Sequence, residues 1–157
     1  YYEQQSLGFN YRLNDLQSAL GISQLKRIDE FIKERNDIAK KYDQLFEGVE
    51  GITTPKINNN CLSSYHLYII RVDQNKLEGR NLIFEKLRNN GILVNIHYIP
   101  IYRQPYYQND YNKANFINSE KYYSEALSLP IFPGLSESQI NEVFNAIVKK
   151  ANFQNLF

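Results

Sequence analysis

The N-terminal third of the chain carries a stripe of apolar residues at helical spacing. Apolar positions recur three, four or seven residues apart, which predicts one amphipathic helix over residues 13–46. Asn14 and Gln17 form a capping-box signature at its start, because each side chain can bond to the backbone amide of the other residue. Gly21 falls inside the stripe and marks either a slight break or a place where another backbone packs closely, of which we favour close packing.

The remainder of the chain predicts strands and helices in alternation. Strands or extended pieces rich in β-branched and aromatic residues are predicted over residues 65–72, 92–98 and 128–132. Helices with an apolar period of three to four are predicted over residues 80–89, 117–127 and 136–151. Residues 99–116 are rich in Tyr, Asn and Pro and predict a long functional loop. This order indicates one α/β (α+β) domain, in which the long helix covers one face of a small sheet.

Composition excludes several classes of function. The formal net charge of +1 is spread over interleaved acidic and basic residues, so we expect neither nucleic acid nor a membrane as partner. Residues 1–5 have neither the basic nor the apolar part of a signal peptide, and no apolar run approaches about 20 residues, the length needed to span a bilayer, so we expect neither feature. The single cysteine, Cys61, fits an ordinary reduced thiol of a cytoplasmic protein. The chain contains no Met, as expected for a piece of a longer protein.

Two places carry side chains that could bind a ligand. Asn10 and Arg12 lie just before the predicted helix, where an amide, a guanidinium and free backbone N–H groups suit an anion such as phosphate. His97 and Tyr98 end a predicted strand, and Arg103 follows in the long loop. Plainer alternatives stay open, since Asn10 also fits a turn cap, Arg12 a surface ion pair and His97 ordinary packing. No metal-ligand spacing, phosphate-binding glycine loop or nucleophile elbow is present.

Residues 8–21, which read G-F-N-Y-R-L-N-D-L-Q-S-A-L-G, resemble a motif of the pyridoxal-phosphate-dependent sugar aminotransferases of the DegT/DnrJ/EryC1/StrS family. The resemblance continues in family order through residues 64–68, 91–92, 97–100 and 127–130. Within the family, residues 11–14 and 97–103 are most similar to the transaminases of pseudaminic acid biosynthesis. The resemblance implies that residues 1–157 form the small C-terminal domain of a fold-type I PLP-dependent transferase, with residues 1–12 as a loop that reaches toward the active site.

The resemblance also implies roles for individual residues. The implied contacts to the cofactor, pyridoxal 5'-phosphate, are Asn10 and Arg12, with Asn10 reaching the active site of the partner subunit. The implied substrate-binding residues are Asn10, Asn95, Ile96, His97, Tyr98 and Arg103, the last near a diphosphate. In the family, the lysine that carries the cofactor and the acidic partner of its ring nitrogen belong to a larger domain before this motif. We therefore expect no catalytic residue in this chain, and expect the chain alone to be inert.

Two functions remain open from the sequence. The leading hypothesis is one part of a homodimeric transaminase that moves an amino group from glutamate onto a UDP-linked 4-keto-6-deoxy sugar. The alternative is a non-catalytic α/β interaction module, which dimerises through its long helix and binds a polar ligand in its aromatic loop. The upstream reading frame separates them, because only the enzyme requires a lysine-bearing domain there.

Overall fold

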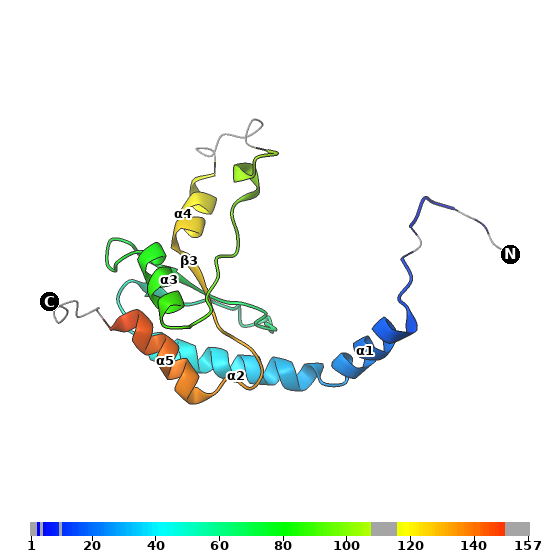
Figure 1. Ribbon diagram of the computed structural model, residues 1–157, viewed down its shortest axis with the longest axis horizontal. Helices are drawn as coiled ribbons and strands as arrows, with labels where there is room; N and C mark the ends of the chain where they lie inside the picture. Colours follow the sequence, from blue (N-terminus) through cyan, green and yellow to red (C-terminus); the bar gives the residue numbers. More distant parts are fainter. Residues whose placement is uncertain (1–2, 4, 10, 108–115, 150–157) are drawn as a thin grey trace.

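The computed structural model describes residues 3, 5–9, 11–107 and 116–149. The elements, in chain order (Figure 1), are α1 (Asp15–Leu25), α2 (Ile28–Phe46), β1 (Ile52–Thr53), β2 (Tyr68–Val72), α3 (Arg80–Asn89), the 3₁₀ helix η1 (Ile101–Arg103), α4 (Ile117–Glu125), β3 (Ala126–Leu129) and α5 (Glu137–Val148). No helix in the described part of the chain is long and apolar enough to cross a membrane. The α/β (α+β) class predicted from the sequence is confirmed.

An antiparallel sheet in the order β1-β2-β3 lies at the centre of the domain. β2 pairs along its length with β3, from Tyr68 opposite Leu129 to Arg71 opposite Ala126. Every residue of β3 is buried, and so are alternate residues of β2, as its aromatic and β-branched sequence favours. α2, α3 and α5 complete the core, and Figure 1 shows α2 and α5 side by side along one side of the sheet.

α2 packs on the sheet through one face. Its buried residues, spaced three or four apart, are Ile38, Ala39, Tyr42 and Phe46. The Tyr42 ring stacks on Tyr68 of β2 with centroids 5.0 Å apart. Both phenols are buried and both donate a hydrogen bond, Tyr42 to the Pro130 carbonyl (3.0 Å) and Tyr68 to the Asp43 carboxylate (2.6 Å). Burial raises the pKa of Tyr42 and of Tyr68, so both stay protonated donors.

The polar side of α2 holds two neighbouring chain segments. Arg35 Nη1 donates to three backbone carbonyls, those of Tyr65 (3.0 Å), His66 (3.3 Å) and Ile131 (2.9 Å). Asn36 Nδ2 donates to the Ser63 carbonyl at 2.9 Å. The segment before β2 and the segment after β3 are therefore fastened to the same turn of one helix.

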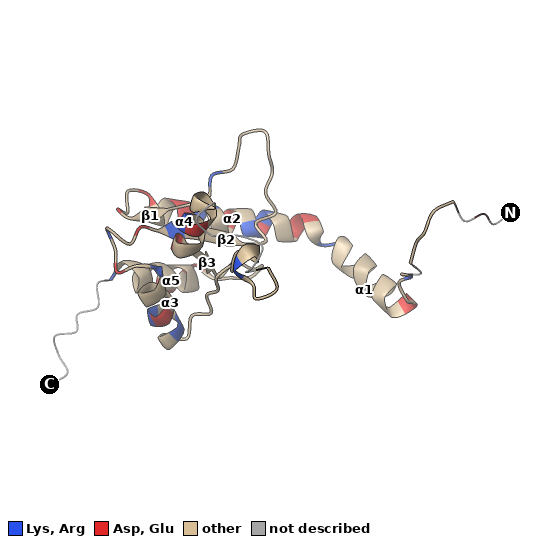
Figure 2. Cartoon of the chain, turned by 90° about the horizontal axis from the view of Figure 1, so that it is seen from above, with Lys and Arg blue, Asp and Glu red and all other residues tan. Residues whose placement is uncertain are grey.

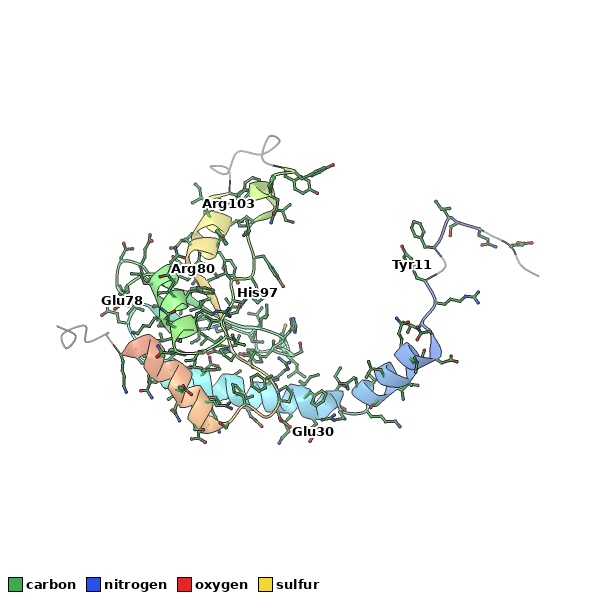
Figure 3. The ribbon with its side chains drawn as sticks, in the orientation of Figure 1. Tyr11, Glu30, Glu78, Arg80, His97 and Arg103 are labelled. Atoms are coloured by element: carbon green, nitrogen blue, oxygen red, sulfur yellow. The ribbon has the colours of Figure 1, made fainter. Side chains whose placement is uncertain are left out.

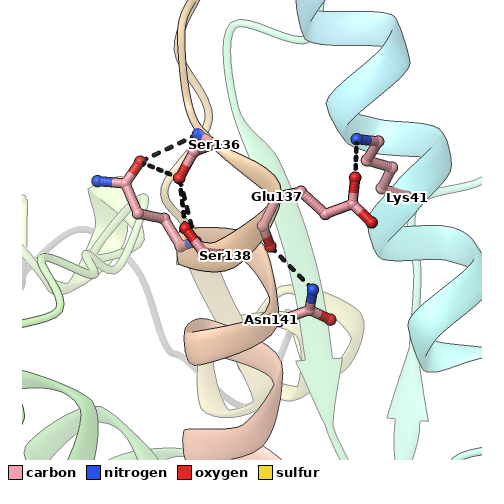
Figure 4. A network of polar contacts seen from close by, with 6 residues as sticks. Lys41, Ser136, Glu137, Ser138 and Asn141 are labelled. Carbon is pink, nitrogen blue, oxygen red and sulfur yellow. Dashed lines mark hydrogen bonds and ion pairs between the residues drawn. The ribbon is translucent and has the colours of Figure 1, made fainter.

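α5 begins as the sequence predicts. Ser136 and Gln139 form the capping box, and the Glu137 carboxylate accepts a hydrogen bond from Lys41 Nζ of α2 at 2.9 Å (Figure 4). The pair lowers the pKa of Glu137 and links the exposed sides of the two helices. The capping box of Asn14 and Gln17 at the start of α1 is confirmed as well. Charges of both signs alternate along α2, whereas α1 carries one charged residue, Asp15 (Figure 2).

The prediction of one continuous helix over residues 13–46 is wrong. The chain turns between α1 and α2, where the Arg27 amide donates to the Gln24 carbonyl (3.0 Å) in a tighter, 3₁₀-type bond. No residue of α1 is buried, so no packed surface holds the two helices in line. The expected close approach at Gly21 is also wrong for this chain, because no described atom lies within 4 Å of a Cβ built there.

The strand predicted over residues 92–98 reduces to one bridge, between Asn95 and Ser128 of β3. In an antiparallel ladder the next hydrogen-bonded pairs would be residue 93 with Pro130, which has no N–H, and His97 with Ala126, whose N–H bonds to the Tyr122 carbonyl. Residues 92–94 still alternate between buried and exposed, as in a strand. A strand-like segment therefore runs beside the sheet and is joined to it by a single bridge.

Other element boundaries move by two or three residues. β2 begins at Tyr68 rather than at residue 65, because Tyr65 has a left-handed backbone (φ 43°). α4 ends at Glu125 and β3 begins at once, two residues earlier than predicted, since pairing with β2 extends to Ala126. α3 has the predicted bounds, residues 80–89, and α5 ends at Val148. Residues 150 and 151, which the prediction included in the last helix, lie outside the described residues.

Substitution of Arg35 tests the role of α2. Arg35→Ala leaves three carbonyls without their donor, so we expect the free energy of unfolding to fall by about 1.5–3 kcal/mol, the range for hydrogen bonds to a charged group. Urea denaturation followed by circular dichroism measures the change. Lys33→Ala is the matched control, because Lys33 is exposed and its pair with Asp37 is 3.8 Å long. Equal stability of the two variants would show that the hydrogen bonds of Arg35 do not stabilise the domain.

Candidate functional site

The segment that follows α3 is anchored to β3 at one residue. Asn95 and Ser128 exchange both backbone hydrogen bonds, with Ser128 N donating to Asn95 O at 2.9 Å and Asn95 N to Ser128 O at 3.3 Å. Ile92 and Val94 fill the core just before this bridge. The bridge fixes the point at which the chain leaves the sheet and carries Ile96, which is half-buried, toward His97.

His97 is held by a side chain of the sheet. Its Nδ1 lies 2.7 Å from the Oγ of Ser128, which is buried in β3. The Tyr98 ring packs edge-on against the imidazole, with centroids 4.5 Å apart and planes at 77°. Tyr98 itself is 72% exposed, so its phenol is accessible to a ligand. The imidazole is thus oriented from two sides.

An aromatic cleft of about 540 Å³ lies next to Tyr98. Its walls come from the segment around η1 and from α4, and its lining includes Tyr98, Ile101, Tyr102, Phe116, Tyr122 and Tyr123. Tyr102 and Phe116 stack with centroids 4.3 Å apart and planes at 11°. Burial and the nearby Glu120 carboxylate raise the pKa of Tyr102, so its hydroxyl stays protonated. A cleft of this kind suits a flat or apolar group with few polar contacts.

Arg103 lies at the same end of the molecule, engaged with a carboxylate. Its Nε donates to Glu120 Oε1 at 2.8 Å, and its Nη2 bonds to Oε2 of the same residue. The guanidinium also lies over the Tyr123 ring, 5.0 Å from the centroid. The bidentate pair raises the pKa of Arg103 and joins η1 to α4. An anionic ligand that uses Arg103 must compete with Glu120.

The N-terminal candidates lie apart from this cleft. Asn10 is outside the described residues. Arg12 is exposed, two residues before the N-cap Asn14, and no carboxylate of the described residues lies within ion-pair distance of it. Figure 3 shows Tyr11, the neighbour of Arg12, far to the right of both Arg103 and His97, which lie closer to each other.

The structure thus brings part of the predicted site together. Asn95 pairs with Ser128 of β3, the His97 imidazole contacts the same serine, and Tyr98 lines the cleft, with Ile96 between them in the chain. Arg103 instead pairs with Glu120 of α4, and Arg12 follows Tyr11, which lies apart from both (Figure 3). Sequence reasoning missed Ser128 and Glu120, the partners of His97 and Arg103. Ser128 belongs to a segment of the family resemblance, which marks the segment without showing what its hydroxyl contacts. No group of metal-ligating side chains occurs among the described residues.

Solved sugar aminotransferases have the same fold. The structure of Helicobacter pylori PseC, an aminotransferase involved in the biosynthesis of pseudoaminic acid, matches with a TM-score of 0.81 and 35% identity over 92% of this chain and 39% of that chain. The PLP form of the putative sugar aminotransferase Spr1654 from Streptococcus pneumoniae matches with a TM-score of 0.79 and 31% identity, over 86% of this chain and 35% of that chain. The fold is that of the smaller part of a fold-type I aminotransferase.

The chain belongs to the DegT/DnrJ/EryC1/StrS aminotransferase family, whose model matches residues 1–148. A relative from Helicobacter pylori, UDP-4-amino-4,6-dideoxy-N-acetyl-beta-L-altrosamine transaminase, is 36% identical over 147 residues. The match covers 94% of this chain and 39% of the relative. The chain therefore spans about two fifths of the length of such relatives. The family resemblance inferred from residues 8–21 is confirmed.

The pair of Arg103 and Glu120 can be tested by hydrogen exchange. Glu120→Gln removes the charge that holds η1 to α4, and a partly exposed pair of this kind contributes modestly to local stability. We therefore expect the Arg103 and Gln104 amides to exchange about two- to fivefold faster. Glu142→Gln on α5 is the control, because this exposed carboxylate forms no ion pair within the described residues. Unchanged exchange in Glu120→Gln would mean that other contacts hold η1.

Proposed function

We propose that the chain is the C-terminal domain of a PLP-dependent nucleotide-sugar transaminase, with residues 1–12 as the loop that reaches toward the active site. The full-length enzyme transfers an amino group from glutamate to a UDP-linked 4-keto-6-deoxy sugar, in pseudaminic acid-type biosynthesis. The observation that carries the proposal is the family match over residues 1–148, in which the motif residues Asn10, Arg12 and His97 all occur. The chain alone, without the lysine-bearing domain, is catalytically inert.

The residues of this domain bind and orient the substrate. In the proposed enzyme, the segment from Asn95 to Tyr98 contacts the nucleotide sugar. Its support is geometric, because the His97 imidazole is held by Ser128 and the exposed Tyr98 borders the aromatic cleft. Arg103 approaches the diphosphate, and Glu120 keeps its guanidinium in place until that anion competes for it. Fixed polar groups of this kind lower the entropic cost of positioning the substrate.

The N-terminal group fits the phosphate of the cofactor. Arg12 is exposed and has no carboxylate partner among the described residues, so its guanidinium is free to bind an anion. Asp15, in the first turn of α1, opposes an anion placed directly on the helix end, which favours the arginine as the main contact. When bound, pyridoxal 5'-phosphate supplies the electron sink for amino transfer. Most of its contacts come from the domain that precedes this chain in the full-length enzyme.

The separation of the two groups favours a homodimer. Arg12 and the His97 cleft lie in different parts of one chain, so a second subunit is the simplest way to bring both kinds of contact to one pocket. α1 also exposes apolar side chains that a partner surface would cover. Its exposed residues include Leu16, Leu20, Ile22 and Leu25.

Covalent trapping of the cofactor tests the enzyme class. We expect the full-length protein to bind pyridoxal 5'-phosphate, and borohydride to fix the cofactor to a lysine that precedes Tyr1, because no lysine after Arg12 matches the family position. Peptide mapping by mass spectrometry identifies the labelled residue. The chain of residues 1–157 alone is the control and should remain unlabelled. A labelled lysine within residues 1–157, or none at all, would favour an interaction module.

Mixing two inactive variants of the full-length enzyme tests the shared site. One variant carries Asn10→Ala and the other lacks the trapped lysine. If Asn10 serves the partner's active site, each mixed dimer regains one intact site, and activity should return to about one quarter of wild type after subunit exchange. The assay follows conversion of UDP-4-amino-4,6-dideoxy-N-acetyl-β-L-altrosamine with 2-oxoglutarate, the reverse of the proposed reaction. No recovery, with mixed dimers confirmed by mass, places Asn10 in its own subunit's site.

A further inference from the structure

Ser128 contacts two residues of the candidate site, although no sequence pattern identified it. Through its amide, its carbonyl and its hydroxyl it bonds to Asn95 and His97, at distances of 2.9, 3.3 and 2.7 Å. We propose that Ser128 is a positioning residue that fixes the His97 imidazole with its proton on Nε2, so that this N–H donates to an oxygen of the bound nucleotide sugar. The part that concerns the sugar rests on the proposed function.

Ser128 is well placed to serve as a fixed reference. β3 is buried along its whole length and pairs with β2, where Ile69 lies opposite Ser128. On the other side of Ser128, the chain bonds to Asn95. Because the backbone is held on both sides, the hydroxyl has little freedom to move away from the imidazole. An orientation imposed by such a rigid strand is sharper than one imposed by a loop.

The proton assignment follows from the hydroxyl. The Ser128 side chain is buried, and its Oγ has one hydrogen-bond partner within the described residues, His97 Nδ1. If Nδ1 carried the proton and donated it, the hydroxyl hydrogen would be buried without an acceptor, which is unfavourable. If the hydroxyl donates to Nδ1, both groups are satisfied. The imidazole proton then lies on Nε2.

Nε2 is the ring nitrogen that remains for a ligand. His97 is half-buried, and within the described part of the chain its Nε2 has no hydrogen-bond partner. The imidazole packs against Tyr98, which borders the aromatic cleft. A neutral N–H donor suits the hydroxyl, carbonyl or phosphate oxygens of a nucleotide sugar. This gives His97 a binding role with a defined tautomer, and Ser128 the role of setting it.

Nuclear magnetic resonance tests the positioning directly. The full-length protein is labelled with ¹⁵N-histidine, and the His97 signals are assigned by their loss in His97→Gln. We expect the wild-type ring to show the Nε2–H tautomer, and Ser128→Ala to shift the ring toward a mixture of tautomers. Ser128→Thr keeps the hydroxyl and should retain the wild-type signals. A wild-type ring with Nδ1 protonated, or identical ring signals in Ser128→Ala, overturns the assignment.

Kinetics test the consequence for the substrate, with the same UDP-amino sugar and 2-oxoglutarate. We expect Ser128→Ala to lower kcat/KM for the sugar about tenfold, the size of effect for one lost orienting hydrogen bond, with KM for 2-oxoglutarate unchanged. Ser128→Thr should restore activity, and Ser128→Ala should add little to His97→Gln, because both remove the same contact. Additive losses, or equal effects on both substrates, overturn the positioning role.

The two experiments also separate this proposal from the proposed function. If borohydride trapping fails and the wild type is inactive, the transaminase assignment and the sugar contact are wrong, whereas the ring signals still decide the pairing of Ser128 with His97. If Ser128→Ala does not fold, the wild-type tautomer and the Ser128→Thr signals decide it. A trapped cofactor with a wild-type Nδ1–H ring overturns the positioning role alone.

Discussion

The packing of α2 against the sheet is the constraint on which the rest of the domain depends. Tyr42 stacks on Tyr68 of β2, and its hydroxyl donates to the carbonyl of Pro130, directly after β3. Phe46, one turn later, packs edge-on against Phe144 of α5. A buried hydroxyl without a partner is costly, so the Tyr42 contact fixes where β3 ends relative to the helix. Arg35 adds hydrogen bonds on the same side of the sheet. α2 thereby fixes the positions of β2 and of the end of β3 relative to the helix.

The candidate site inherits its geometry from that arrangement. β3 is placed by β2 and by the helices, and Ser128 of β3 then places Asn95 and His97. Farther along the chain, the bidentate ion pair of Arg103 and Glu120 holds η1 to α4, the two elements that form the walls of the aromatic cleft. The core and the site are therefore parts of one chain of contacts. A substitution that shifts β3 would displace the imidazole even though it touches no ligand.

Local signals in the sequence were sufficient for the elements that depend on local contacts. Both capping boxes and the bounds of α3 follow from residues three or four apart, and the structure has them as predicted. The predictions failed where a distant contact decides. The strand over residues 92–98 is limited to one bridge, because Pro130 has no N–H and the Ala126 N–H already bonds to Tyr122. The long helix breaks where α1 has no packing partner among the described residues. The partner of His97 is 31 residues away in the sequence, so no spacing rule could have identified Ser128.

The exposed helix α1 connects folding with function in the proposed enzyme. A helix of 11 residues with none buried is marginal in water, since helices shorter than about 12–15 residues gain too little from backbone bonds alone. Its capping box supports the first turn but covers none of the apolar side chains. A protein surface that buries Leu16 and Leu20 would stabilise α1, and with it the position of Arg12 just before the N-cap. In the proposed homodimer, dimerisation of the full-length enzyme would therefore also position Arg12 to bind the phosphate.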